Sequence, residues 1–191
     1  TIHQWGKLNL QYVEDNKDNR QLYDGATFFM SGYKKVFDDI GGFDGFSFVP
    51  AFCEDDDFLI RAKLKGYDLK TTESSIVYHF VSQTSRYSDD YKKDRIKYEV
   101  NSNRNFVRKW GIPFSVFNEL RFWEDSKFEY PTFTMTLITR NETNLYHLEP
   151  FFDKIDLGRI PEDYIEMEQQ NTRYDLRSKF TLFAGSDVVI T

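Results

Sequence analysis

Four consecutive acidic residues, Glu54, Asp55, Asp56 and Asp57, are followed by an apolar stretch and then by Arg61. Neighbouring carboxylates repel one another, and unpaired buried charges are very costly. The N–H groups and the dipole at the start of a helix offset part of that repulsion. In such a helix Asp57 pairs with Arg61, which leaves Glu54 and Asp55 free to face a cleft. A carboxylate held there can act as the general base for a hydroxyl group that attacks an electrophilic carbon.

Other interpretations of these residues compete with catalysis. An isolated acidic run is more often a solvated helix cap than an active site. An EF-hand calcium loop does not fit, because the alternating oxygen ligands and the central glycine are absent. His79, at the end of the apolar run 76–78, is by itself typical of a packed or surface histidine.

Two helices and a loop are expected to position the acidic run. We expect a helix from the acidic cluster to Lys65, ended by Gly66, with acidic residues in its first turn and lysines in its last. Residues 43–52 are rich in glycine and aromatic residues and predict a loop. Before the loop, Ser31 is expected to cap a helix that runs through Asp39 and ends at Gly41 and Gly42.

Further elements follow from hydrophobic periodicity. The N-terminal part predicts strands at 7–12, 25–30, 67–70 and 75–80, a polar loop at 14–21, and a long basic helix at 89–110 that ends at Gly111. Beyond it we expect an aromatic, acidic connector, a strand at 131–139, a helix carrying Leu145, Leu148, Phe151 and Phe152, and strands at 164–168 and 186–191. This order of strand, helix and strand indicates a βαβ unit with a parallel sheet.

Composition limits the class of protein. The 191 residues include 40% hydrophobic and 29% charged residues, which is ordinary globular usage. A net charge of −6 argues against a nucleic-acid groove, which needs clustered positive charge. The single cysteine suits a reducing compartment, and the sequence has neither a signal-peptide pattern nor an apolar run long enough for a transmembrane segment. We therefore expect a soluble, cytoplasmic protein.

An ordered set of short motifs resembles a known family. The set comprises Gly-Ala-Thr-Phe-Phe-Met at 25–30, Val-Phe at 36–37, Ile-Gly-Gly-Phe-Asp at 40–44, Glu-Asp-Asp-Asp-Phe at 54–58 with Arg61, Gly-Tyr at 66–67, Val-Tyr-His at 77–79 with Ser82, Asn-Phe at 105–106 and Lys-Trp-Gly at 109–111. It is similar to the C-terminal, acceptor-side half of a family-2-type glycosyltransferase of the GT-A fold, and to the Glu-Asp-Asp-Asp segment of the β-1,4-galactosyltransferases. The resemblance implies an α/β, Rossmann-like fold with a mixed sheet flanked by helices, incomplete in this chain.

The resemblance also implies a function, that of a hexosyltransferase. A sugar would pass from a nucleotide sugar, most naturally a UDP-sugar, to a hydroxyl group of a glycan, and a positioned base favours inversion. Asp55 would be the general base and Glu54 would orient the acceptor, although the division of labour among the acidic residues stays open. The implied substrate-binding residues are Gly25, Asp56, Arg61 and Trp110. His79 would be a ligand of Mn²⁺ or Mg²⁺, which neutralises the departing nucleoside diphosphate.

The donor-binding half of such an enzyme has no counterpart before Gly25, so we expect the chain by itself to lack independent catalysis. We divide the chain into an acceptor-side half (1–111), a connector (112–130) and a βαβ unit (131–191) that resembles the opening of a second glycosyltransferase-like domain. A tandem enzyme and a rearranged domain both fit this order. The rival functions are a noncatalytic carbohydrate-binding or scaffolding module and an acidic, aromatic interaction domain.

Overall fold

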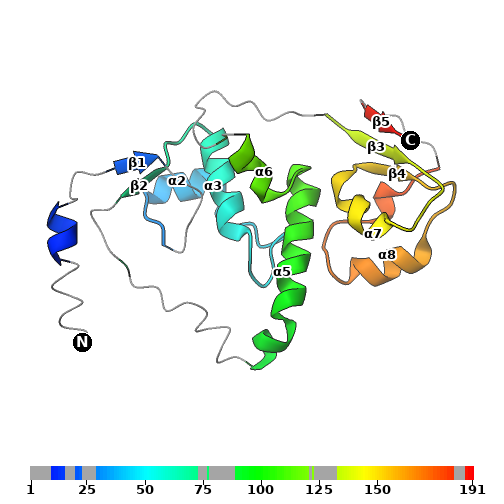
Figure 1. The fold of residues 1–191 in the computed structure, drawn as a ribbon, viewed down its shortest axis with the longest axis horizontal. Helices are drawn as coiled ribbons and strands as arrows, with labels where there is room; N and C mark the ends of the chain where they lie inside the picture. Colours follow the sequence, from blue (N-terminus) through cyan, green and yellow to red (C-terminus); the bar gives the residue numbers. More distant parts are fainter. Residues whose placement is uncertain are drawn as a thin grey trace.

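A computed structural model of the chain describes residues 10–15, 20–22, 29–72, 77, 89–120, 122, 133–182 and 188–191. It has a mixed α/β architecture (Figure 1), which confirms the predicted class. The elements are β1 (Arg20–Leu22), α2 (Lys34–Ile40), α3 (Glu54–Leu64), β2 (Lys70–Thr72), α5 (Asp89–Trp110), α6 (Phe114–Glu119), β3 (Met135–Ile138), α7 (Leu145–Leu148), η1 (Glu149–Phe151), β4 (Lys154–Asp156), α8 (Glu162–Gln169), η2 (Arg177–Lys179) and β5 (Val188–Ile190).

The long helix α5 stands between two groups of elements (Figure 1). On one side lie α2, α3 and the antiparallel pair β1–β2, and on the other lies a three-stranded sheet with α7 and α8. Each side has its own apolar core. The first core is aromatic and includes Phe48, Phe58, Phe106, Trp110 and Phe117. The second is built from the aliphatic and aromatic residues of the sheet and α8, among them Leu137, Ile155, Ile165, Leu176 and Phe180.

Two predicted helix ends are confirmed around the first core. Helix α2 ends at Gly41, whose φ of 87° is the left-handed conformation that glycine adopts without a Cβ penalty. Gly66, with the same φ, ends α3, and its N–H donates to the Lys63 carbonyl. The predicted cap at Ser31 is wrong: Tyr33 occupies the N-cap position and makes no side-chain capping bond.

The three-stranded sheet is parallel throughout, with the order β4-β3-β5. Leu137 at its centre pairs with Ile155 on β4 and with Ile190 on β5. The parallel sheet predicted for this region is therefore confirmed. Among the described residues this sheet and the β1–β2 pair are separate, and the GT-A assignment stays a prediction.

One predicted strand in this unit is wrong. Residues 164–168 belong to the helix α8, and the second strand is β4 instead. The apolar residues Tyr164, Ile165 and Met167 fit either a strand or a helix. In the structure the buried residues of the segment are Ile165 and Glu168, which are three residues apart. That spacing is helical, and the acidic residues of the first turn complement the helix dipole.

The predictions for the N-terminal residues 7–21 are wrong where the structure describes them. Residues 10–15 form a helix, although we predicted a strand at 7–12 and a loop at 14–21, and residues 20–22 form β1. The alternating apolar residues do not face a core: Leu10 is 73% exposed and Tyr12 is 43% exposed. A side-chain bond from Gln11 Nε2 to Asp15 Oδ1, four residues on, supports the helix instead.

The remaining predicted elements are partly confirmed, partly shifted or absent, and partly outside the described residues. Helix α5 has the predicted bounds, and the loop at 43–52 is confirmed. The strand expected at 67–70 begins later, as β2. Phe29 and Met30 lie outside any strand, whereas residues 25–28, and all of 75–80 except Val77, lie outside the described part of the chain.

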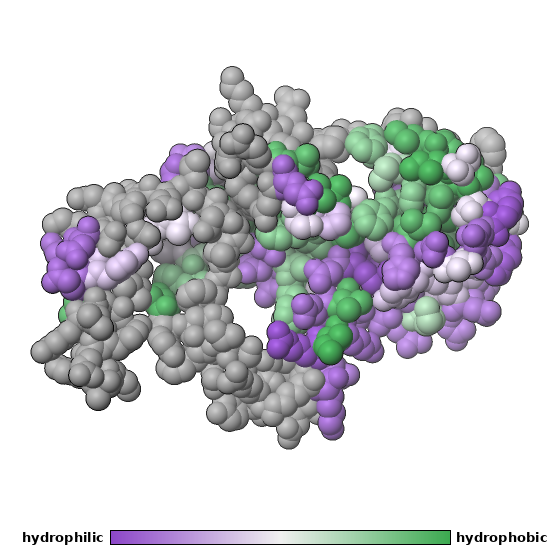
Figure 2. Space-filling model, viewed as in Figure 1, coloured by the Kyte–Doolittle hydropathy of each residue, from purple (hydrophilic) through white to green (hydrophobic). Residues whose placement is uncertain are grey.

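Strand β5 presents apolar side chains at the surface: Val188, Val189 and Ile190 are each 40–47% exposed. Figure 2 shows hydrophobic side chains gathered over this end of the sheet, whereas the side chains over α8 are mostly hydrophilic.

A buried charge network joins α5 to the sheet unit. Arg104 and Arg108 donate to Glu149 on η1 and to Glu168 on α8. Lys179 donates to Glu149 as well, at 2.7 Å. The carboxylates of Glu149 and Glu168 are at most 1% exposed. Because every charge in the network has an opposite partner, burial of the five side chains is tolerated.

Candidate functional site

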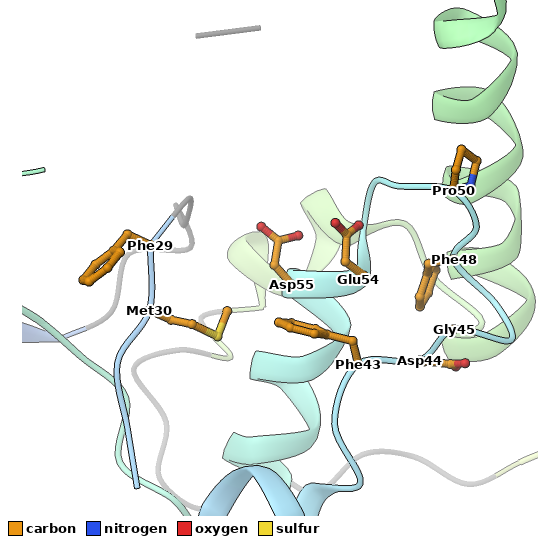
Figure 3. A pocket seen from close by; sticks show the side chains of 9 residues that line it. All are labelled: Phe29, Met30, Phe43, Asp44, Gly45, Phe48, Pro50, Glu54 and Asp55. Atoms are coloured by element: carbon orange, nitrogen blue, oxygen red, sulfur yellow. The ribbon is translucent and has the colours of Figure 1, made fainter. Parts of the chain in front are cut away.

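A pocket of about 400 Å³ opens at the N-terminus of α3. Its walls come from three segments: the residues before α2, the loop 43–50 and the first turn of α3. The lining residues are Phe29, Met30, Phe43, Asp44, Gly45, Phe48, Pro50, Glu54 and Asp55. Figure 3 shows the carboxylates of Glu54 and Asp55 extending in the same direction from α3, between Met30 on one side and Phe48 on the other. The predicted cleft in front of these two acids is thus present.

The backbone just before α3 turns sharply. Phe52 and the N-cap residue Cys53 both have positive φ, 77° and 66°, which is uncommon for residues other than glycine. The Cys53 carbonyl accepts the first helical bond, from the Asp57 N–H at 3.0 Å. This turn brings the chain from the pocket loop directly into the acidic first turn, so the helix begins at the pocket. Such left-handed residues are often found at functional sites.

Glu54 is the acid with an unused acceptor. Its Oε2 atom is buried and has no hydrogen-bond partner among the described residues. Burial raises the pKa of Glu54, and the negative charge of Asp55 raises it further. A buried oxygen without a donor is costly for the protein alone.

Asp56 lies beside these acids without lining the pocket. Burial, followed by the charges of Asp55 and Glu54, raises its pKa to about 7. The ordinary pKa of an aspartate is 3.8, so the folded protein keeps this proton to a higher pH than the unfolded chain does. Folding stability consequently falls as the pH rises from about 4 to about 7.

We expect Asp56→Asn to stabilise the protein at pH 8, by about 1–2 kcal/mol after allowance for solvent screening. The gain should shrink as the pH is lowered from 7 towards 4, because wild-type Asp56 is then protonated in the folded state. Urea unfolding followed by circular dichroism at several pH values measures it. Asp38→Asn, at an exposed position on α2, is the control. An equal gain at pH 4 and pH 8 would contradict the raised pKa.

Asp57 faces the protein interior and is fully buried. It accepts hydrogen bonds from Arg61 Nε at 2.8 Å and from Trp110 Nε1 at 3.0 Å, and Lys109 Nζ lies 2.7 Å away. The pair of Asp57 with Arg61, predicted from their spacing, is confirmed. Arg61 also donates to the Ile40 carbonyl at the end of α2. These contacts fasten α3 to α2 and to α5.

The loop 43–50 is organised by Asp44. Its Oδ1 accepts the N–H groups of Phe46 and Ser47, and its Oδ2 accepts the Ser47 hydroxyl and Lys109 Nζ, the latter at 2.6 Å. Burial alone would raise the pKa of Asp44, but the bonds from Lys109 and Ser47 outweigh it and hold the pKa well below its usual range. Lys109 therefore links the pocket loop to Asp57, and so to α3.

Of the predicted site residues that the structure describes, two line the pocket. Glu54 and Asp55 meet in the pocket, whereas Asp56, Arg61 and Trp110 are close by but do not line it. Gly25 and His79 lie outside the described residues. Within the described part of the chain, no group of three or more His, Cys, Asp or Glu side chains could hold a metal ion. The substrate contacts of Gly25, Asp56, Arg61 and Trp110 and the metal contact of His79 stay predictions.

The role of Trp110 can be tested by Trp110→Phe. Because the variant removes a donor from a buried carboxylate, we expect a loss of about 1–3 kcal/mol in the free energy of unfolding. Urea unfolding measures it, with Tyr33→Phe at a 79% exposed position as the control. If the stability is unchanged but sugar binding is weakened, Trp110 contacts substrate instead.

Sequence reasoning missed Asp44, Lys109 and the aromatic walls Phe43 and Phe48 as site-forming residues. Phe43 and Asp44 belong to the motif at 40–44 and Lys109 to the motif at 109–111, but their place in the motifs does not indicate these roles. An available signal was Asp44 followed by Ser47, since an aspartate commonly accepts backbone N–H groups two and three residues further on. The contact between Asp44 and Lys109, 65 residues apart, required the fold.

No helix within the described residues is long and apolar enough to cross a membrane. Comparison with known proteins finds no family model, no curated protein and no solved structure that matches the chain.

Proposed function

We propose that the pocket is the acceptor side of a glycosyltransferase of the GT-A type, which moves a sugar from a nucleotide-sugar donor to a hydroxyl group of a glycan. The observation that carries the proposal is the pair Glu54 and Asp55 at the start of α3, facing a pocket with phenylalanine walls. Aromatic faces stack on the apolar faces of sugar rings, and carboxylates accept hydrogen bonds from hydroxyl groups. A sugar needs both kinds of contact at once.

In the proposed reaction Asp55 takes the proton of the acceptor hydroxyl group. The hydroxyl oxygen then forms a bond to the anomeric carbon of the donor sugar, as the bond from that carbon to the nucleoside diphosphate breaks. Direct displacement inverts the anomeric configuration. Glu54, whose side chain lines the pocket, would accept a second hydroxyl group of the acceptor and so fix its orientation.

A divalent cation, Mn²⁺ or Mg²⁺, belongs to the predicted chemistry, with His79 as a ligand. The described residues do not supply a set of ligands for it. We therefore assign no step to a metal ion.

The direct test is a transfer assay with the full-length protein. UDP-glucose, UDP-galactose, UDP-N-acetylglucosamine and UDP-glucuronic acid serve as donors, and the methyl β-glycosides of glucose, galactose and N-acetylglucosamine serve as acceptors. A disaccharide product, detected by mass spectrometry, supports the proposal. Binding of a methyl glycoside without any product would favour the rival function, a noncatalytic carbohydrate-binding module. Neither binding nor product with any of these probes would count against both.

A further inference from the structure

We infer that the turn of residues 172–174, which follows α8, positions the pocket loop and thereby sets the affinity for the acceptor. The effect on acceptor affinity rests on the proposed function, but the positioning of the loop can be tested separately. It makes Arg173 and Tyr174, which lie outside the acceptor-side motifs, positioning residues of the candidate site.

Three contacts join the turn to the loop. The Arg173 guanidinium donates to the carbonyl of Gly45, a pocket-lining residue, at 3.0 Å. The Tyr174 ring meets the Phe46 ring edge-on, with 5.5 Å between centroids. The Tyr174 hydroxyl lies 2.9 Å from Ser47 Oγ. The turn thus contacts three consecutive residues of the loop, 45, 46 and 47.

These contacts continue into the pocket. The Ser47 hydroxyl donates its single hydrogen to Asp44 Oδ2 at 2.7 Å. Tyr174 must therefore be the donor in its bond to Ser47, and a chain of hydrogen bonds runs from Tyr174 through Ser47 to Asp44. Asp44 lines the pocket and holds the turn of the loop through the N–H groups of Phe46 and Ser47.

The turn is itself held firmly on α8. Gln169 Nε2 donates to the carbonyls of Thr172 and Tyr174, at 3.0 and 2.7 Å, and the Tyr174 N–H donates to Thr172 Oγ1. A rigid turn can fix a loop at little entropic cost. Helix α5 also holds the loop, since Asn105 Nδ2 donates to the Ser47 carbonyl at 3.0 Å and Lys109 contacts Asp44. The contacts with the turn matter only if α5 alone does not hold the loop in place.

Hydrogen exchange answers that question without reference to activity. We compare the wild-type chain with the double variant Arg173→Ala/Tyr174→Ala and with the control Arg159→Ala, which removes an exposed arginine ion pair on the same unit. In the double variant the amide hydrogens of Phe46 and Ser47 should exchange roughly tenfold faster, while those of α3 and α8 keep their rates. Unchanged exchange at Phe46 and Ser47 would overturn the inference, because α5 would then hold the loop alone.

The consequence for the site is measured with the full-length protein in the transfer assay. Glu54 and Asp55 are on α3 and stay in place, so the double variant should raise the KM for the methyl glycoside acceptor roughly five- to tenfold with kcat nearly unchanged. Tyr174→Phe, which keeps the ring on Phe46 but loses the hydroxyl group, should recover part of the affinity. An acceptor KM that stays at the wild-type value in the double variant, or that rises equally in Arg159→Ala, would overturn the assignment. If the amide hydrogens of Phe46 and Ser47 exchange faster in the double variant but the wild-type protein transfers no sugar, the positioning role stands and only the proposed function is contradicted.

Discussion

Glu149→Gln is expected to lower the free energy of unfolding by about 3–5 kcal/mol, the usual cost of removing one partner from a buried ion pair. Glu149 is fully buried and accepts bonds from Arg108 Nη2 at 2.6 Å, from Lys179 Nζ at 2.7 Å and from the Tyr164 hydroxyl at 3.1 Å. A neutral amide offers one acceptor oxygen where the carboxylate offers two. The variant would leave Arg108, 1% exposed, with excess positive charge beside Lys179.

The pH dependence of stability gives a second readout of the same carboxylate. Burial alone would raise the pKa of Glu149, but the bonds and charges of Arg108 and Lys179 outweigh it and lower the pKa from 4.5 to about 2. Between these values the unfolded chain binds more protons than the folded protein, so stability increases with pH there. The contribution of Glu149, on the order of 3 kcal/mol, is complete above pH 4.5 and is lost as the pH falls towards 2.

Urea unfolding from pH 7 to pH 2, followed by circular dichroism, measures both effects. The difference between wild type and Glu149→Gln should narrow as the pH falls below 4.5. The matched control is Glu142→Gln, which removes a carboxylate paired with Arg159 in an exposed ion pair and should cost less than about 1 kcal/mol. If the two variants are equally stable at pH 7, the network does not join α5 to the sheet unit in the way that its burial indicates.

This network also marks the limit of sequence reasoning. Helix α5 was predicted with its correct bounds, because a long polar helical run and Gly111 define it locally. The same run predicted a basic helix without indicating which of its charges are buried. Two of its three arginines, Arg104 and Arg108, lie one turn apart and face buried carboxylates on η1 and α8. Charged residues are expected at the surface, and only the fold shows which of them find opposite charges inside.

The candidate site divides in the same way. The acidic turn, its helix and the pair of Asp57 with Arg61 depend on residues of one short segment, 54–66, and the sequence was sufficient for them. The walls of the pocket depend on a loop held by Lys109 from α5 and by Tyr174 from beyond α8. Contacts over 65 and 127 residues have no local signature. The sequence therefore predicted that Glu54 and Asp55 face a cleft, but it did not predict the contacts that position the walls of that cleft.

Asp55→Asn is expected to lower kcat for sugar transfer by roughly 100- to 10,000-fold, the usual contribution of a general base. Asp55 Oδ1 accepts the N–H group of Asp56 at 3.0 Å, and the amide oxygen of asparagine can keep this bond. The variant should therefore fold normally and still bind the acceptor, because the phenylalanine walls and Glu54 are intact. The measurement is the initial rate of transfer from the active UDP-sugar to the methyl glycoside, together with the KM for the acceptor.

Glu54→Gln separates the two carboxylates. If Asp55 is the base and Glu54 orients the acceptor, Glu54→Gln should mainly raise the acceptor KM, because an amide accepts a hydroxyl hydrogen bond less strongly than a carboxylate does. Asp38→Asn, outside the pocket on α2, should change neither constant. A large loss of kcat in Glu54→Gln with little loss in Asp55→Asn would exchange the two roles. Unchanged turnover in both variants would show that the acidic turn takes no part in catalysis. Asp44 could not then serve as the base, although it is the other carboxylate that lines the pocket among the described residues. Its oxygens already accept hydrogen bonds from Lys109, from the Ser47 hydroxyl group and from the loop N–H groups.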